Sequence, residues 1–247
     1  MRIKGGNLME HQLHGKVAVI TGASSGIGLA VAEELHALGM RLVLNARREE
    51  LLADTGGKLM AATVAGDITS PSLPGELLEM ALKTYGRCDV VMNNAGIIET
   101  GPIATIDIEK VCAMVRVNVE AAFRVAHTFV RHFLSQGHGH LLNTSSVLGT
   151  KVRPTAGAYS GTKFAIEALS EALRMELAGT AVAVTCIEPG LALTDLHRDL
   201  PEHPGKTMGI DRPLLPQDVA RCVRFALTQP DHVRIPRIMV IPGEHQI

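Results

Sequence analysis

The sequence contains no tryptophan, and aromatic residues make up only 3% of its 247 positions. Hydrophobic residues nevertheless reach 46%, so the core has to be built from Val, Ile, Leu, Ala and Met. Such a core of small and branched side chains suits helices packed closely on a parallel sheet. Charged residues make up 20%, a proportion that indicates a folded domain and argues against disorder.

An excess of one charge is also missing, since the formal net charge is −1. There is no basic block and no basic stripe interleaved with aromatic residues, which argues against a nucleic-acid partner. The longest apolar runs are far shorter than a membrane span, so we expect no membrane partner. Residues 1–14 lack the apolar segment of a signal peptide. We expect them to form a flexible leader before one domain over residues 15–247, in the cytoplasm.

Cysteine is scarce and follows no metal-binding or disulfide pattern. The four cysteines are Cys88, Cys112, Cys186 and Cys222. They have no CxxC spacing and lie in apolar contexts, which predicts buried free thiols in a reducing cytoplasm. The HGH motif at residues 138–140 has no third ligand at metal-site spacing, so we predict a turn before a strand and no metal.

The hydrophobic pattern alternates between short runs typical of buried strands and longer runs with helical spacing. Strands are predicted at Val17–Thr21, Arg41–Asn45, Met60–Ala65, Asp89–Asn93, His140–Thr144, Ala181–Ile187 and Arg237–Ile241. Helices are predicted at Gly26–Leu38, Glu49–Asp54, Pro74–Tyr85, Asp107–Ser135, Ala158–Ala178 and Gln217–Gln229. The alternation predicts an α/β fold: a single-domain, Rossmann-type, doubly wound parallel sheet of about seven strands with helices on both faces. Residues 191–216 lack periodicity and are rich in Pro, Asp and His, which favours a lid or substrate loop.

Ligands of doubly wound sheets bind beyond the carboxyl ends of the strands, so the residues after each strand carry the functional signal. The first predicted strand is followed by TGASSGIG at residues 21–28, directly before a helix. Gly22, Gly26 and Gly28 allow a tight turn, close approach to a pyrophosphate and close helix packing. The helix N-terminus then offers free N–H groups to the phosphate. An ordinary glycine turn is the less favoured alternative.

The second predicted strand is followed by Arg47 and Arg48, where an NAD site usually has an acidic residue. A guanidinium can bind a 2′-phosphate through two hydrogen bonds, so the sequence favours NADP(H) over NAD(H). The alternative is that both arginines are solvated and balance Glu49 and Glu50. Asp67, after the third strand, is placed either to contact an adenine edge or to cap a helix.

Tyr159 and Lys163 are four residues apart, which places them one turn apart on one face of a predicted helix. A free phenol has a pKa of about 10, and a nearby ammonium would lower it toward the useful range for proton transfer. Ser145 or Ser146 could place a hydroxyl beside the tyrosine, or could form a simple serine turn. Asn118 interrupts an apolar helical pattern, which predicts either a solvated face or a helix distortion that lines the site.

The elements that follow one another along the chain are TGASSGIG at 21–28, GD at 66–67, NNAG at 93–96, Asn118, Ser146, YSGTK at 159–163 and PGLALT at 189–194. In this order they resemble the short-chain dehydrogenase/reductase family, over essentially residues 15–241. Ser146 is preferred to Ser145 because it precedes Tyr159 by thirteen residues (146 to 159), the family's usual interval.

The resemblance implies a catalytic tetrad. Tyr159 would be the general acid and base, Ser146 would polarise the carbonyl, Lys163 would bind the nicotinamide ribose, and Asn118 would hold a water of a proton relay. The cofactor contacts that it implies are Gly22, Ser24, Ser25, Gly26, Ile27, Gly28, Arg47, Arg48, Asp67, Asn94, Ala95, Gly96, Val117, Tyr159, Lys163, Pro189, Gly190, Ala192 and Thr194. The family is usually tetrameric, so a homotetramer is implied as well.

The expected function is NADP-dependent transfer of a hydride between nicotinamide and a carbonyl or secondary alcohol of a small molecule. One alternative is a non-catalytic NADP-binding regulatory protein of the same fold, since fold alone does not fix function. Another is a sugar-nucleotide epimerase or dehydratase, which usually has a longer substrate domain and a differently spaced glycine-rich loop.

Overall fold

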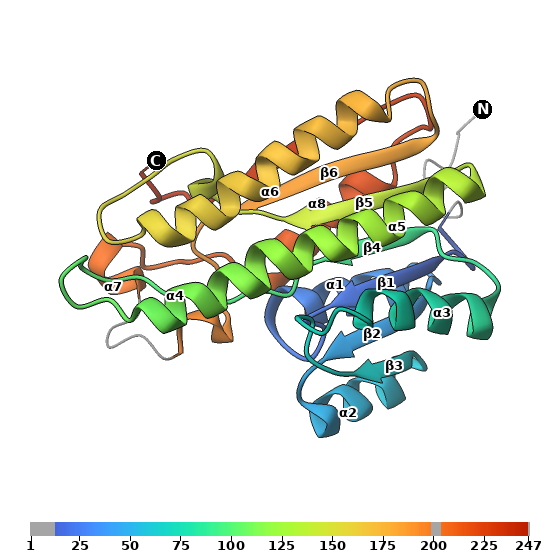
Figure 1. Ribbon diagram of the computed structural model, residues 1–247, viewed down its shortest axis with the longest axis horizontal. Coiled ribbons are helices and arrows are strands. Elements are labelled where there is room, and N and C mark those ends of the chain that lie inside the picture. Colours follow the sequence, from blue (N-terminus) through green and yellow to red (C-terminus); the bar gives the residue numbers. More distant parts are fainter. Residues whose placement is uncertain (1–12, 199–203, 247) are drawn as a thin grey trace, which may run out of the picture.

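The computed structural model describes residues 13–198 and 204–246 (Figure 1). Seven strands form one parallel sheet in the order β3-β2-β1-β4-β5-β6-β7. The strand order reverses direction between β1 and β4, as in a doubly wound sheet. The predicted fold class is confirmed.

The elements lie close to the predicted ranges. The strands are β1 (Val17–Thr21), β2 (Arg41–Ala46), β3 (Ala62–Ala65), β4 (Val90–Asn93), β5 (Gly139–Thr144), β6 (Val182–Pro189) and β7 (Arg237–Val240). The α-helices are α1 (Gly26–Ala37), α2 (Glu49–Leu59), α3 (Leu73–Tyr85), α4 (Ile108–Val115), α5 (Ala122–Gln136), α6 (Gly157–Glu176), α7 (Pro204–Met208) and α8 (Pro216–Leu227). Two short 3-10 turns, Val147–Gly149 and Asp195–His197, follow β5 and β6.

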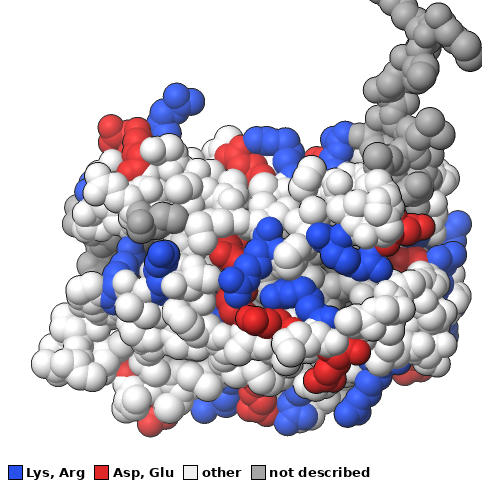
Figure 2. Space-filling view, turned by 90° about the horizontal axis from the view of Figure 1, so that it is seen from above, with Lys and Arg blue, Asp and Glu red and all other residues white. Residues whose placement is uncertain are grey.

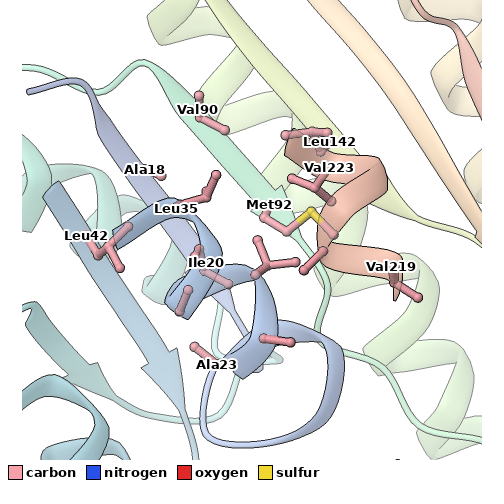
Figure 3. Close-up of a cluster of buried hydrophobic side chains, with 14 of the residues drawn as sticks. Ala18, Ile20, Ala23, Leu35, Leu42, Val90, Met92, Leu142, Val219 and Val223 are labelled. Carbon is pink, nitrogen blue, oxygen red and sulfur yellow. The ribbon is translucent and has the colours of Figure 1, made fainter. Parts of the chain in front are cut away.

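Each face of the sheet has its own core because successive side chains of a strand point to opposite faces. Ala18 and Ile20 of β1 pack with α1 and α8 in one cluster, which Figure 3 shows in close-up. Val17 and Val19 belong to the other cluster, which contains Phe129 of α5. In Figure 1, α4, α5 and α6 cross one face of the sheet, while α1 and α8 lie behind it.

The boundary between α2 and β3 differs most from the prediction. Helix α2 continues past Asp54 through Gly56 to Leu59 and ends at Met60, which has a left-handed φ of 49°. Met60 therefore caps the helix and cannot begin the strand, which starts at Ala62. The helix tolerates Gly56 because a Cβ there would lie 2.5 Å from Thr63 Cγ2, so close packing on β3 requires glycine.

The single long helix predicted over 107–135 is three consecutive segments. Asp107 is the N-cap, and its carboxylate accepts hydrogen bonds from the N–H groups of Glu109 and Lys110. Helix α4 then passes into a π-helical segment, Arg116–Ala121, before α5 begins. Asn118 lies in this segment and is 2% exposed, so the predicted helix distortion is confirmed and the solvated-face alternative is wrong.

The predicted lid over 191–216 is anchored at both ends. Ala192 and Leu214 form a parallel bridge, and Leu193 N–H donates to Leu214 O at 2.8 Å. Between these ends lie the 3-10 turn and α7, while residues 199–203 are outside the described residues. Of the predicted leader, residues 1–12 are also outside them. Leu13, however, is buried, at 2% exposed.

The cysteines are free thiols, but only two are buried as predicted. Cys88 and Cys186 are fully buried, Cys222 is half-buried and Cys112 is exposed on α4. Within residues 13–198 and 204–246, no three His, Cys, Asp or Glu side chains gather in a way that could hold a metal. No helix of these residues combines the length and apolarity that a membrane span needs. On the face shown in Figure 2, acidic and basic side chains are interspersed.

Candidate active site

The carboxyl ends of β1, β2, β4, β5 and β6 open onto one cavity of about 1070 Å³. This is the edge at which doubly wound sheets bind their ligands, beside the reversal of strand order between β1 and β4. The volume exceeds that of an ordinary small-molecule site, so it has room for a dinucleotide and a small substrate.

The glycine-rich loop after β1 is held tightly against the loop after β4. Gly22 has a φ of 67°, and a Cβ added there would lie 3.1 Å from Ala95 Cα. Thr21 Oγ1 accepts hydrogen bonds from Asn94 N–H at 2.9 Å and Ala95 N–H at 3.0 Å. At Gly28 a Cβ would lie 2.3 Å from Gly22 O. Any side chain at these two glycines would therefore collide with the loops or fill the space between them.

Arg48 reaches back to the glycine-rich loop. Its guanidinium donates to Ser25 Oγ at 2.8 Å and to Ser24 Oγ at 3.3 Å. On another side it faces Asp195 Oδ2 at 3.7 Å. Arg48 therefore belongs to the hydrogen-bond network of the loop, and the alternative of a merely solvated arginine is wrong for it.

Arg47 and Asp67 lie beside each other at the same edge. Arg47 is exposed, and its charge contributes to lowering the pKa of Asp67. The largest cause of that lowered pKa is the backbone N–H of Thr69, which donates to Asp67 Oδ1 at 2.9 Å. Asp67 thus accepts hydrogen bonds within a local turn and lines the cavity, whereas the cap of the following helix α3 is Ser72, so the predicted helix-cap role is wrong.

Tyr159 and Lys163 lie on helix α6, and both line the cavity. Lys163 Nζ donates to Thr144 O, at the end of β5, at 2.8 Å and lies 5.8 Å from the centre of the Tyr159 ring. Ser146 caps the 3-10 turn after β5, and its hydroxyl lies near enough to Tyr159 to lower the pKa of the phenol. Three members of the predicted tetrad therefore converge on one point, and all three line the cavity.

Asn118 lies one layer behind them. Its Oδ1 accepts from Ile97 N–H at 2.9 Å, and its Nδ2 donates to Ile97 O at 2.8 Å and to Thr162 Oγ1 at 3.2 Å. A Cβ added at Gly96 would lie 3.3 Å from Asn118 Oδ1 and 3.8 Å from Lys163 Nζ. Gly96 therefore keeps open the space between the amide and the ammonium, although Asn118 itself does not line the cavity.

Burial dominates the pKa values of the Tyr159–Lys163 pair. Burial raises the pKa of Tyr159 to about 12, although the Ser146 hydroxyl and the positive charge of Arg153 lower it. Burial lowers the pKa of Lys163 to about 8. The expected lowering of the phenol pKa by Lys163 is therefore not found: the groups that lower it are Ser146 and Arg153, and desolvation outweighs them in a pair whose members are each 6% exposed.

The segment after β6 closes the cavity from the other side. Gly190 N–H donates to Val240 O at 2.7 Å, which ties the Pro-Gly turn to β7. Thr194 Oγ1 accepts from Leu196 N–H at 3.3 Å. Thr194 Cβ lies 3.3 Å from the Cβ position of Gly26, so this segment touches the glycine-rich loop.

The structure brings most of the predicted site residues together. Those that line the cavity are Gly22, Ser24, Ser25, Gly26, Ile27, Arg47, Arg48, Asp67, Asn94, Ala95, Gly96, Val117, Ser146, Tyr159, Lys163, Pro189, Gly190, Ala192 and Thr194. Gly28 and Asn118 do not line it but pack directly behind it. Thr21 and Thr144 were missed, although each stands at a strand end where the sequence could have indicated it.

Glu188, which precedes the Pro-Gly turn, is scaffold outside the cavity lining. It is 2% exposed and its Oε1 lies 3.5 Å from Arg237 Nε. Glu167 of α6, at 4% exposed, places Oε2 3.2 Å from the same nitrogen. Burial, and then the charge of Glu167, raise the pKa of Glu188.

Comparison with known proteins agrees with this geometry. Residues 16–205 match the short chain dehydrogenase family, and the chain belongs to that family. An uncharacterized oxidoreductase of Staphylococcus epidermidis is 36% identical over 229 residues, which cover 92% of this chain and 97% of the relative.

Two solved structures share the fold over nearly the whole chain. The closed form of a serine dehydrogenase complexed with NADP+ has a TM-score of 0.87 at 26% identity and covers 94% of this chain and 96% of its own. A 3-ketoacyl-(acyl-carrier-protein) reductase from Brucella melitensis, complexed with NADH, has a TM-score of 0.85 at 28% identity and covers 94% and 99%. The protein is therefore an oxidoreductase of a family whose members bind nicotinamide cofactors.

Proposed function

We propose that the protein is an NADP(H)-dependent oxidoreductase that transfers a hydride between the nicotinamide and a carbonyl or secondary alcohol of a small molecule. Tyr159 acts as general acid in reduction and as general base in oxidation. The observation that carries the proposal is the convergence of Ser146, Tyr159 and Lys163 in the cavity that also contains the glycine-rich loop.

The residues present fit a dinucleotide. Gly22 and Gly28 hold the loop in a form that side chains would block, and α1 begins directly after it with free N–H groups for a pyrophosphate. Pro189, Gly190 and Thr194 would hold the carboxamide end, and Lys163 the ribose hydroxyls next to the nicotinamide.

When bound, NADPH would supply the hydride for the carbonyl carbon and would leave as NADP+. The Tyr159 phenol donates its proton to the carbonyl oxygen, so that C=O becomes CH–OH. Ser146 orients this oxygen and polarises the bond by hydrogen bonding. Lys163 returns a proton to Tyr159, and Asn118 holds the water that connects Lys163 to solvent. Burial at 6% exposure keeps competing water away from the phenol.

The preference for NADP(H) rests on Arg48. A guanidinium already held beside Ser24 and Ser25 stands at the second strand end, where the adenosine ribose lies in this fold. The related structures contain NADP+ in one case and NADH in another, so the arginine is the argument specific to this chain.

A screen for NADPH consumption tests the proposal. The purified protein is mixed with NADPH and with ketones, aldehydes, keto acids or keto esters, and the loss of NADPH is followed by its absorbance at about 340 nm. Tyr159→Phe removes only the hydroxyl, and we expect turnover to fall about 10²- to 10⁴-fold while NADPH binding is retained. Tyr85→Phe is the matched control, because Tyr85 is the only other tyrosine and donates to Leu42 O at 3.2 Å, away from the cavity.

Two outcomes would contradict the proposal. Turnover that persists in Tyr159→Phe would remove the catalytic role of the phenol. NADPH binding without turnover of any carbonyl compound would favour the regulatory alternative, or an enzyme that recycles its own bound nucleotide.

We further propose a homotetramer built through the surface of α4, α5 and α6. This surface exposes apolar side chains that a monomer would leave in water, among them Ile108 at 63% and Met175 at 73%. Light scattering that gave the mass of a monomer would exclude the assembly. A cytoplasmic location remains part of the same proposal.

A further inference from the structure

The half of the cavity beyond the nicotinamide side is lined by three segments that no cofactor motif includes. They are the loop after β5, which carries Lys151 and Arg153, helix α7 with Met208, and the C-terminal tail with His245. These segments line the same cavity as Tyr159, so a substrate whose carbonyl reaches the phenol can contact them. Their side chains therefore determine the substrate class.

Arg153 is half-buried, and its guanidinium donates a hydrogen bond to a weak acceptor. Its Nη1 donates to the thioether sulfur of Met208 at 3.0 Å, and thioethers accept hydrogen bonds only weakly. Within residues 13–198 and 204–246, no carboxylate lies at ion-pair distance from Arg153. Two other arginines that line the cavity differ, since Arg48 and Arg198 both face Asp195, at 3.7 and 3.8 Å.

The acidic residues of the cavity do not balance Arg153. Among the described residues that line it, Asp67 and Asp195 are the acidic ones. Asp195 is shared by two arginines, and Asp67 lies at the opposite end beside Arg47. A guanidinium that lines a cavity without a carboxylate partner is available to pair with an anionic ligand that enters the cavity.

His245 adds a second polar group that lacks a partner. Its Nδ1 is buried and has no hydrogen-bond partner within the described residues. The ring packs on the Pro-Gly turn, where a Cβ at Gly190 would lie 2.6 Å from that nitrogen. Burial, followed by the charge of Arg153, lowers the pKa of His245 and so disfavours the charged form of the ring.

Arg153 is also close to the reacting group. Its positive charge acts on the Tyr159 phenol as the smallest of three influences on the Tyr159 pKa, opposing the larger effect of burial, which raises that pKa to about 12. An anion bound to Arg153 would thus be held within the reach of a small molecule whose carbonyl faces the phenol.

We propose that Arg153, assisted by His245, binds a carboxylate carried by the substrate, and that the enzyme reduces small keto or aldehyde acids in preference to neutral carbonyl compounds. The planar guanidinium can bind a carboxylate through two parallel hydrogen bonds, and His245 can contribute a third contact. This inference rests on the proposed reduction by Tyr159, and it adds the chemical class of the substrate.

The test compares acids with their own neutral esters. The substrates are 2-oxobutanoate, 3-oxobutanoate and 4-oxobutanoate, each beside its methyl ester, with NADPH as reductant. We expect the wild type to prefer at least one acid to its ester. Arg153→Met should lower kcat/KM for that acid by about 10- to 100-fold, the value of hydrogen bonds to a charged partner. The ester should change by less than about threefold, and Arg153→Lys should lie between.

Three controls make the result specific. Lys83→Met removes one exposed cation on α3, far from the cavity, and should leave the acid-to-ester ratio unchanged. The dissociation constant of NADPH should stay the same in Arg153→Met. Glyceraldehyde 3-phosphate is compared with glyceraldehyde, because a preference for the phosphate alone would overturn the assignment of a carboxylate.

Loss of acid and ester activity in equal proportion would overturn the proposal, as would a wild type that prefers every ester. Turnover of no carbonyl compound at all would instead defeat the proposed function itself. If the Arg153 variant fails to fold, an inhibition experiment on the wild type still tests the proposal. Butanoate should inhibit ester reduction competitively and butanamide should not, and equal inhibition by both would also overturn the proposal.

Discussion

Arg237 lies between two buried carboxylates, so we expect its removal to lower the free energy of unfolding. Arg237 Nε lies 3.2 Å from Glu167 Oε2 and 3.5 Å from Glu188 Oε1, and both carboxylates are less than 5% exposed. Arg237→Met keeps much of the apolar stem but removes the charge. Within the described residues, the remaining positive charge that acts on Glu188 is that of Arg174, while Glu171 adds a further negative charge beside Arg237.

Removing one partner of a buried ion pair costs about 3–5 kcal/mol. Because the Arg237 side chain is 41% exposed, solvent screens part of the interaction, and we expect a loss of about 2 kcal/mol. In a domain of this size that corresponds to a decrease in Tm of about 4–8 °C. Thermal unfolding followed by circular dichroism measures it. Arg221→Met, which removes an exposed ion pair with Asp218, serves as control and should cost less than about 1 kcal/mol.

The pH dependence follows from the raised pKa of Glu188. In the window above the unfolded-state pKa of about 4.5, the folded protein retains a proton that the unfolded chain releases, so stability falls as pH rises. Without Arg237 the folded pKa rises further, and the deficit of Arg237→Met should be larger at pH 8 than at pH 5. Adding Glu188→Gln should restore most of the loss. Equal deficits at both pH values, without rescue, would show that the arginine acts by packing and refute the electrostatic argument.

Two other predictions concern the cofactor site. In steady-state kinetics with both cofactors, Arg48→Ala should raise KM for NADPH by about tenfold or more and change KM for NADH by less than about threefold. Equal changes in the two KM values would show that Arg48 does not bind the 2′-phosphate. Because the pKa of Lys163 is lowered to about 8, its ammonium is lost as pH rises through that value. Thus kcat/KM for reduction should fall about tenfold per pH unit above it, whereas Lys163→Arg, if active, should show no such limb below pH 10.

The parts of the site that the sequence predicted are those attached to regular elements. In a parallel sheet every strand delivers the residues that follow it to the same edge, so finding the strands also places Gly22, Arg48 and Ser146 together. The spacing of four does the same for Tyr159 and Lys163 on α6. Asn118 could be singled out because an amide inside an apolar helical pattern requires a partner, and the structure provides three hydrogen bonds.

What escaped prediction depends on contacts between segments distant in sequence. The left-handed residue that ends α2 is Met60, a residue type that gives no such signal, and so the strand boundary was misplaced. Arg153 stands in an irregular loop and His245 in the C-terminal tail, 92 residues apart (153 to 245). No periodicity relates them, and their proximity arises only when β7 brings the tail back over the Pro-Gly turn.

The pKa values of the tyrosine–lysine pair show why a local motif does not define a catalyst by itself. Spacing places the phenol and the amine together, but the surrounding core penalises both the phenolate and the ammonium, moving their pKa values to about 12 and about 8. At neutral pH such a phenol is a proton donor, as reduction requires. For the phenol to lose its proton it needs positive charge close by, which Arg153 supplies in part. An anionic substrate bound to Arg153 would offset that charge and raise the pKa of the phenol further. With an acid bound, the Lys163 ammonium, 5.8 Å from the centre of the Tyr159 ring, would therefore have to stabilise the phenolate that is left when the carbonyl oxygen takes the proton.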